Sequence, residues 1–82
     1  MNRVKLLFFA TLRDRAGTRS MELDVPLDLT IQGLKEKISM DYPNLKESMR
    51  SVLVTINREY AFDEAIIPQN AEVAMFTPVS GG

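Results

Sequence analysis

The segment from Thr30 to Pro43 restricts the fold more than any other, because it carries the one clear helical stripe in the sequence. Its apolar side chains recur at Ile31, Leu34 and Ile38, which is the spacing of one face of an α-helix. Thr30 is suited to cap the first turn, and Pro43 disfavours helical geometry at the residue before it. The sequence therefore predicts a helix that begins after Thr30 and ends shortly before the proline.

Most of the remaining chain alternates between apolar and polar residues, a period of two that is typical of β-strands. Gly17 is suited to a turn, so we expect the first two strands to form a hairpin joined by a loop at 13–18. A shorter edge strand is expected around Phe62. The four longer strand patterns cover residues 4–9, 19–25, 52–57 and 72–79.

The order of the expected elements is strand, strand, helix, strand, short strand, strand, within a chain long enough for one domain. Runs of strands with a single helix are typical of α+β domains in which the helix packs on one face of a mixed sheet. A β-grasp (ubiquitin-like) arrangement fits this order. In that arrangement the first and last strands lie side by side and parallel in the middle of the sheet, a pairing that the sequence alone does not prove.

The second face of such a sheet carries unexpected apolar residues. One helix covers one face, so the other face should be polar in a monomer. Instead it carries Leu7 and Phe9 on the first strand, and Ala74 and Phe76 on the last. If these strands are neighbours, the two phenylalanines meet at the end that leads into the C-terminal tail. Exposed apolar patches of this kind mark partner surfaces, although a loop that folds over the patch is the alternative.

Several functional classes are disfavoured by what the composition lacks. The chain has no cysteine and no histidine, so it has neither a thiol nucleophile nor an imidazole base, and zinc and soft metals lack their usual ligands. Its net charge is −1 with scattered basic residues, which argues against nucleic acid. No apolar run would span a bilayer and no start resembles a signal peptide, so we expect a cytoplasmic protein that binds no membrane.

The chain finishes in FTPVSGG, and its last two residues are Gly81 and Gly82. Without Cβ atoms these residues can thread a narrow channel and present an unhindered carboxylate to another enzyme. Pro78 lacks an amide donor, which favours a tail that leaves the sheet unpaired. We therefore expect a folded domain at 1–76 and a flexible tail at 77–82. A chance pair of glycines or an engineered end is the alternative.

These features resemble the MoaD family of ubiquitin-like sulfur carriers, the small subunits of molybdopterin synthase. The likeness covers the whole chain, through LLFFATLRDRAG, LTIQGLKEKI, VTIN and the C-terminal FTPVSGG. The family usually ends in Phe-Pro-Pro-Val-Ser-Gly-Gly, so Thr77 replaces the first proline of the pair. PQNAEV likewise replaces the commoner Asp-Gly-Asp-Glu-Val turn. These departures concern the geometry of the tail rather than its chemistry.

The resemblance implies that Gly82 is adenylated by a ubiquitin-activating-like adenylyltransferase that uses ATP, and is then converted to a thiocarboxylate. The tail would insert into the large subunit of a heterotetramer, where the sulfur passes to a cyclic pyranopterin precursor. The chain itself would bind no cofactor or metal and supply no catalytic side chain. The residues carried over are Gly81 and Gly82 at the sulfur-carrying end, and Phe9, Arg13, Tyr60 and Phe76 at the partner interface.

Three other functions stay open. The chain could carry sulfur for another pathway, such as thiamin or cysteine synthesis, since related carriers share the Gly-Gly end. It could be a ubiquitin-like modifier joined to lysines through Gly82. It could also be a binding module whose tail has no role, in which case removal of the last two residues would change nothing.

Overall fold

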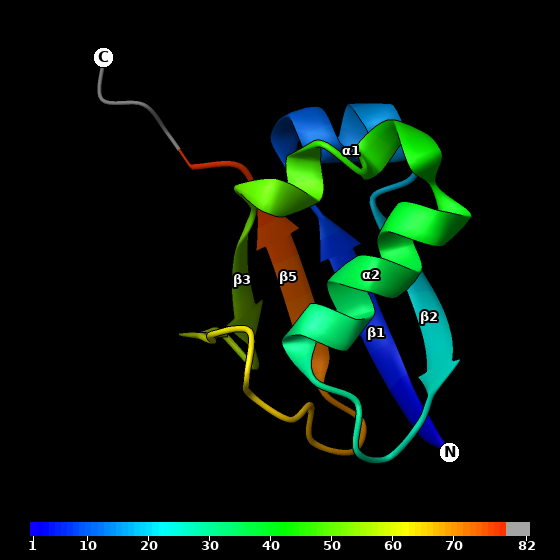
Figure 1. Cartoon of the computed structure of the whole chain (residues 1–82), viewed down its shortest axis with the longest axis vertical. Helices are drawn as coiled ribbons and strands as arrows, with labels where there is room; N and C mark the ends of the chain where they lie inside the picture. Colours follow the sequence, from blue (N-terminus) through cyan, green and yellow to red (C-terminus); the bar gives the residue numbers. More distant parts are fainter. Residues whose placement is uncertain (79–82) are drawn as a thin grey trace.

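A computed structural model of the chain describes residues 1–78, in which two α-helices accompany a sheet of five strands (Figure 1). The strands lie in the order β2-β1-β5-β3-β4. Their bounds are β1 Asn2–Phe8, β2 Ser20–Val25, β3 Leu53–Ile56, β4 Glu59–Tyr60 and β5 Glu72–Phe76. The helices are α1 Ala10–Ala16 and α2 Ile31–Asp41, and two 3-10 turns, η1 Pro43–Leu45 and η2 Ser48–Arg50, follow α2.

The first and last strands are parallel neighbours in the middle of the sheet. Leu6 of β1 lies opposite Val73 of β5, and Phe8 lies opposite Met75. The other strand pairs, β1–β2, β3–β5 and β3–β4, are antiparallel. This mixed sheet with its crossing helix is the predicted α+β, β-grasp arrangement, and the predicted pairing of the terminal strands is confirmed.

Helix α2 follows the sequence prediction closely. The Thr30 hydroxyl accepts a hydrogen bond from the Gly33 amide at 3.1 Å, which caps the first turn. Ile31, Leu34 and Ile38 are fully buried, so the predicted stripe packs on the sheet. In Figure 1 the helix lies across the face formed by β1 and β5. The core beneath it contains Val4, Leu6, Phe8, Val25, Val54, Val73 and Met75.

The predicted loop at 13–18 is wrong in part, because the structure forms α1 at Ala10–Ala16. Gly17 ends this helix with a left-handed φ of 76°, and its amide donates to the Arg13 carbonyl at 3.0 Å, so its role in the turn is confirmed. Leu12 is the helix's fully buried residue. One buried side chain in seven residues produces no helical period, and the sequence therefore predicted a loop instead of a helix.

The predicted edge strand around Phe62 is displaced toward the N-terminus, since β4 is Glu59–Tyr60. Before it, Asn57 and Arg58 have φ of 49° and 72°, which makes a tight two-residue hairpin. Phe62 lies in the segment after β4. The segment between α2 and β3 contains the two short 3-10 turns.

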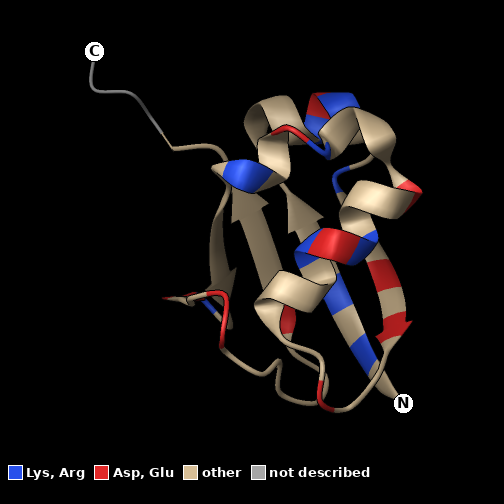
Figure 2. Cartoon of the chain, viewed as in Figure 1, with Lys and Arg blue, Asp and Glu red and all other residues tan. Residues whose placement is uncertain are grey.

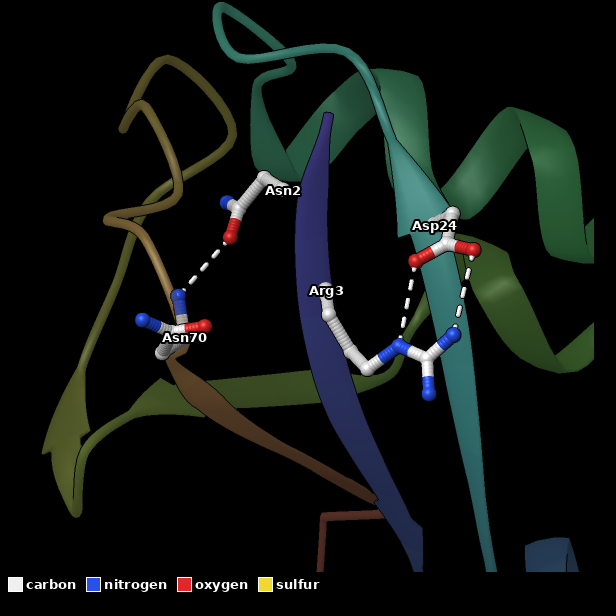
Figure 3. A network of polar contacts seen from close by, with 4 residues as sticks. All are labelled: Asn2, Arg3, Asp24 and Asn70. Carbon is white, nitrogen blue, oxygen red and sulfur yellow. Dashed lines mark hydrogen bonds and ion pairs between the residues drawn. The ribbon is translucent and has the colours of Figure 1, made fainter.

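Asn2 fixes the long connection between β4 and β5 to the start of β1. Its buried side chain donates from Nδ2 to the carbonyls of Ile67 and Pro68, at 3.2 and 2.9 Å. Its Oδ1 accepts from the amide of Asn70 at 2.8 Å (Figure 3). Every polar atom of this side chain is therefore engaged, as burial requires.

Candidate functional site: the open face of the sheet

The face of the sheet opposite α2 is not covered by a helix, and we call it the open face. Burial alternates along β1, where Val4 and Leu6 point into the core and Arg3 and Lys5 are exposed. The same alternation holds on β5, where Val73 is buried. The strand register therefore defines which side chains lie next to one another on the open face.

The open face has two unlike ends. The end beside the tail carries mainly apolar side chains, and we call it the apolar end; the other end alternates acids and bases, and we call it the charged end. Figure 2 shows charged bands on β1 and β2 away from the tail, while β3 carries none. The apolar end comprises Leu7, Phe9, Leu53, Thr55, Tyr60, Ala74 and Phe76, and the charged end comprises Arg3, Lys5, Glu22, Asp24 and Glu72.

Two rings pack together at the apolar end. The Tyr60 and Phe76 ring centroids are 6.2 Å apart with planes inclined at 58°, which is a favourable aromatic geometry. Tyr60 is 72% exposed even so, and Leu53, which lies opposite Phe76 on β3, is 38% exposed. Sequence reasoning missed Leu53. The alternation along β3 could have found it, because it places Leu53 on the face opposite Val54.

Phe9 follows β1 directly and caps α1 in an extended conformation. Its amide donates to the Met75 carbonyl at 3.2 Å, which keeps it beside β5, and its side chain is 48% exposed. The sequence predicted that Phe9 and Phe76 meet at this end. Both lie there, but the ring recorded against Phe76 belongs to Tyr60.

Arg13 lies on α1 instead of in the predicted loop at 13–18. Its Nε is 3.9 Å from the Asp14 carboxylate, and both side chains are largely exposed. Its backbone amide donates to the Phe9 carbonyl at 3.4 Å in the first turn of α1, and the interface role of its side chain stays a prediction. At the root of the tail, the hydroxyls of Thr11 and Thr77 are 3.5 Å apart, which brings the start of α1 beside the chain that leaves β5. Gly81 and Gly82 lie outside the described residues.

The charged end contains a paired acid and base. Arg3 Nε and Nη2 donate to the two carboxylate oxygens of Asp24, at 3.2 and 3.3 Å (Figure 3). This hydrogen bonding and the opposite charge lower the pKa of the Asp24 carboxyl and raise that of the Arg3 guanidinium. Both side chains are more than half exposed, so water screens the pair and it contributes little stability.

In the part of the chain that the structure describes, buried polar side chains are paired and acidic side chains are dispersed. Within residues 1–78, no three acidic side chains gather where they could hold a metal ion. The same stretch contains no buried side-chain nitrogen or oxygen that lacks a hydrogen-bond partner. Nor does any helix there have the length and hydropathy needed to cross a membrane. What the open face offers is a surface for contact, with an apolar end beside the tail.

The sequence profile of the ThiS family matches residues 6–82. The chain belongs to this family. It is 37% identical to the molybdopterin synthase sulfur carrier subunit of Dictyostelium discoideum, over 99% of this chain and 98% of that one. The resemblance noted in the sequence is therefore confirmed.

Solved structures agree with this family assignment. SAMP1 from Haloferax volcanii, a small archaeal modifier protein, has a TM-score of 0.86 at 27% identity and matches 99% of this chain and all of its own. A chain in the complex of subunits 1 and 2 of the Helicobacter pylori molybdopterin-converting factor has a TM-score of 0.70 at 16% identity, over 98% of this chain and 99% of that one. The fold of this ThiS family member is thus the ubiquitin-like β-grasp.

Proposed function

We propose that this chain is the sulfur-carrier subunit of a molybdopterin synthase. The observation that carries the proposal is its full-length likeness to a curated subunit of that name. Neither histidine nor cysteine is present to perform the chemistry within the chain. We infer that the chain donates sulfur and that a larger partner subunit supplies the catalytic residues, by analogy with the two-subunit Helicobacter pylori complex.

The reactive group in this proposal is the C-terminal carboxylate of Gly82. On a ubiquitin-activating-like enzyme, the carboxylate attacks ATP, which forms an acyl-adenylate and releases pyrophosphate. A sulfur nucleophile then displaces AMP, and a thiocarboxylate remains on Gly82. Its sulfur passes to the cyclic pyranopterin precursor and forms part of the molybdopterin dithiolene, while water attacks the Gly82 acyl carbon, the carbon–sulfur bond breaks, and the carboxylate is regenerated. ATP is bound by the activating enzyme, and this cycle runs in the cytoplasm.

The apolar end of the open face supports the docking part of the proposal. Phe76 is the last residue of β5, so the surface that would contact the large subunit adjoins the root of the tail. A partner that covers this surface therefore receives the tail at a fixed position. Gly81 and Gly82 would then enter its active site, since residues without Cβ fit where a side chain would clash. We expect two copies of each subunit in the assembly.

Intact-mass spectrometry of the chain purified from its native host tests the proposal. We expect a fraction of the protein to carry one sulfur in place of one oxygen at Gly82. Deletion of Gly82 should abolish both this mass change and molybdoenzyme activity in a host that lacks its own carrier. The deletion lies beyond β5, so the thermal midpoint should stay unchanged. Full molybdoenzyme activity with the deleted chain would contradict the proposal.

A second candidate is a ubiquitin-like protein modifier, which the likeness to the Haloferax volcanii modifier protein favours. In that case Gly82 would form isopeptide bonds with lysines of other proteins. Digestion of host proteins would then leave branched glycine remnants on lysine, and these would disappear when Gly82 is deleted. Their absence, together with a thiocarboxylate on the chain, would leave sulfur transfer as the function.

A further inference from the structure

Phe62 is a large aromatic side chain that lies outside the open face, in the segment after β4. It is 80% exposed. Burial of an aromatic side chain is favourable, and most of the Phe62 ring does not obtain that stabilisation in the isolated chain. Single exposed apolar residues are ordinary, so the argument depends on how the ring is held and on what surrounds it.

The segment that carries Phe62 is tied to the start of α2. The amide of Ile31 donates to the Ala65 carbonyl at 2.9 Å, and the amide of Gln32 donates to the Asp63 carbonyl at 3.0 Å. These are donors that the first turn of a helix cannot pair internally. Within the segment, the Ala65 amide donates to the Phe62 carbonyl at 3.0 Å. The backbone at Phe62 is therefore ordered before any partner binds, which lowers the entropic cost of association.

A hollow of about 530 Å³ opens between this segment and the β3–β4 hairpin, at the edge of the sheet. Its volume falls within the roughly 300–1,000 Å³ of protein binding pockets. Tyr60 belongs to two surfaces, since it lines the hollow and also packs against Phe76. The hollow therefore meets the apolar end at Tyr60, at the edge of the sheet. Its apolar lining consists of Ile56, Tyr60, Ala61, Phe62, Ala65 and Pro68.

Glu59 and Glu64 also line the hollow and give it a negative character. Within residues 1–78, neither carboxylate takes part in an ion pair. The nearest cation along the chain is Arg58, in the hairpin turn. Charge complementarity therefore favours a partner side chain that brings a positive charge.

The β3–β4 hairpin forms the other wall of the hollow, opposite the segment that carries Phe62, and it is also fixed by hydrogen bonds. The Asn57 amide donates to the Glu72 carbonyl at 2.8 Å, and the Asn57 Oδ1 accepts from the Glu72 amide at 2.9 Å. Both walls of the hollow are thus in place. A small-molecule ligand fits this site less well than a protein side chain, because no buried side-chain nitrogen or oxygen of the described residues is left unpaired to orient it.

We propose that this hollow receives an apolar side chain of the large subunit, with a lysine or arginine beside it that pairs with Glu59 or Glu64. The inference rests on the proposed function, because it extends the docking surface for the same partner around the edge of the sheet. Phe62 is then a specificity-determining residue of the interface, together with the rings of Tyr60 and Phe76.

Another hollow, of about 560 Å³, lies beside α2 and differs in character. Acids and bases both line it, and Lys35 Nζ is already 2.7 Å from the Asp63 carboxylate. Met40 on its wall is 80% exposed, the same fraction as Phe62. Because Met40 has no link to the apolar end, it provides a matched control for an exposed apolar side chain.

Isothermal titration of the full-length chain against the large subunit from the same host tests the inference. Phe62→Ala and the bulkier polar Phe62→Gln should each weaken binding about tenfold or more. Met40→Ala should bind like the unchanged chain. Glu64→Lys should slow association, and its deficit should shrink as salt is raised, since salt screens exposed charge. Thermal midpoints measured alongside should match that of the unchanged chain.

Each alternative outcome has a distinct meaning. Unchanged affinity in both Phe62 variants, with lost affinity in Phe76→Ala, would overturn the inference and leave the proposed function in place. Failure of the unchanged chain to bind the large subunit would overturn the proposed function itself. Self-association that disappears in Phe62→Ala would assign the hollow to a second copy of the chain, which also overturns the inference.

Discussion

The two ends of the open face lie on the same strands but hold different side chains. At the charged end, Arg3 and Asp24 face each other across β1 and β2 and stay in water. At the apolar end, Tyr60 and Phe76 pack together while most of the Tyr60 ring remains exposed. A sheet face that served only to keep the domain in solution would be charged throughout. The apolar side chains are instead gathered beside the tail.

This difference separates two tasks of one small domain. The Asn2 contacts near the charged end maintain the fold, the charged end itself stays in water, and the apolar end is available to a partner. Substitution of Asn2 should therefore change stability, substitutions at the apolar end should change affinity, and those at the charged end should change neither by much. The predictions below test that separation.

The largest effect is expected from Phe76→Ala. Aromatic residues near the centre of an interface often cost 2 kcal/mol or more when truncated, so binding to the large subunit should weaken about 30-fold or more. Titration calorimetry measures this change. Lys5→Ala, on the neighbouring strand at the charged end, is the matched control and should keep full affinity. Equal losses in the two variants would break the comparison.

Asn2→Ala should reduce stability and leave affinity intact. The substitution removes hydrogen bonds to Ile67, Pro68 and Asn70, and unpaired buried groups cost about 1–3 kcal/mol. Urea unfolding should show a lower midpoint, and titration at a temperature where the variant is folded should show unchanged binding. A loss of affinity in the folded variant would mean that the β4–β5 connection also shapes the interface.

Leu53→Ala should weaken partner binding by about 1 kcal/mol, a smaller loss than that of Phe76→Ala. Leu53 lies opposite Phe76 and has the smaller side chain, so its truncation removes less contact area. Binding measured beside Phe76→Ala and the double variant shows whether the two side chains act together. If the losses of binding free energy in the two single variants sum to the loss in the double variant, the two side chains contact separate parts of the partner.

The smallest effect concerns the pH dependence of the Arg3–Asp24 pair. The pKa of Asp24 is lowered in the folded chain, so the pair's contribution is complete above the ordinary aspartate pKa of about 3.9 and is lost as pH falls through the folded value. Asp24→Asn should therefore lose less stability than the unchanged chain between about pH 5 and pH 2. Urea midpoints across this pH range measure the difference. An equal change of the midpoint with pH in the two proteins would contradict the prediction.

The sequence predicted α2, the parallel pairing of the terminal strands and the apolar second face, because each leaves a period or an order in the residues. It did not predict α1, whose single buried residue, Leu12, leaves no helical period. It also placed the edge strand too late, since two residues of β4 are too few to alternate visibly. The hollow at Phe62 was not predictable, because it depends on hydrogen bonds between segments far apart in the chain.

Hydrogen exchange of the chain, free and bound to the large subunit, tests the central claim most directly. We expect binding to slow exchange in β3, β4 and the end of β5, and to leave the amides around Arg3 and Asp24 unchanged. Slowed exchange centred on the charged end or on α2, with none at Tyr60 and Phe76, would contradict the assignment of the apolar end as the docking surface.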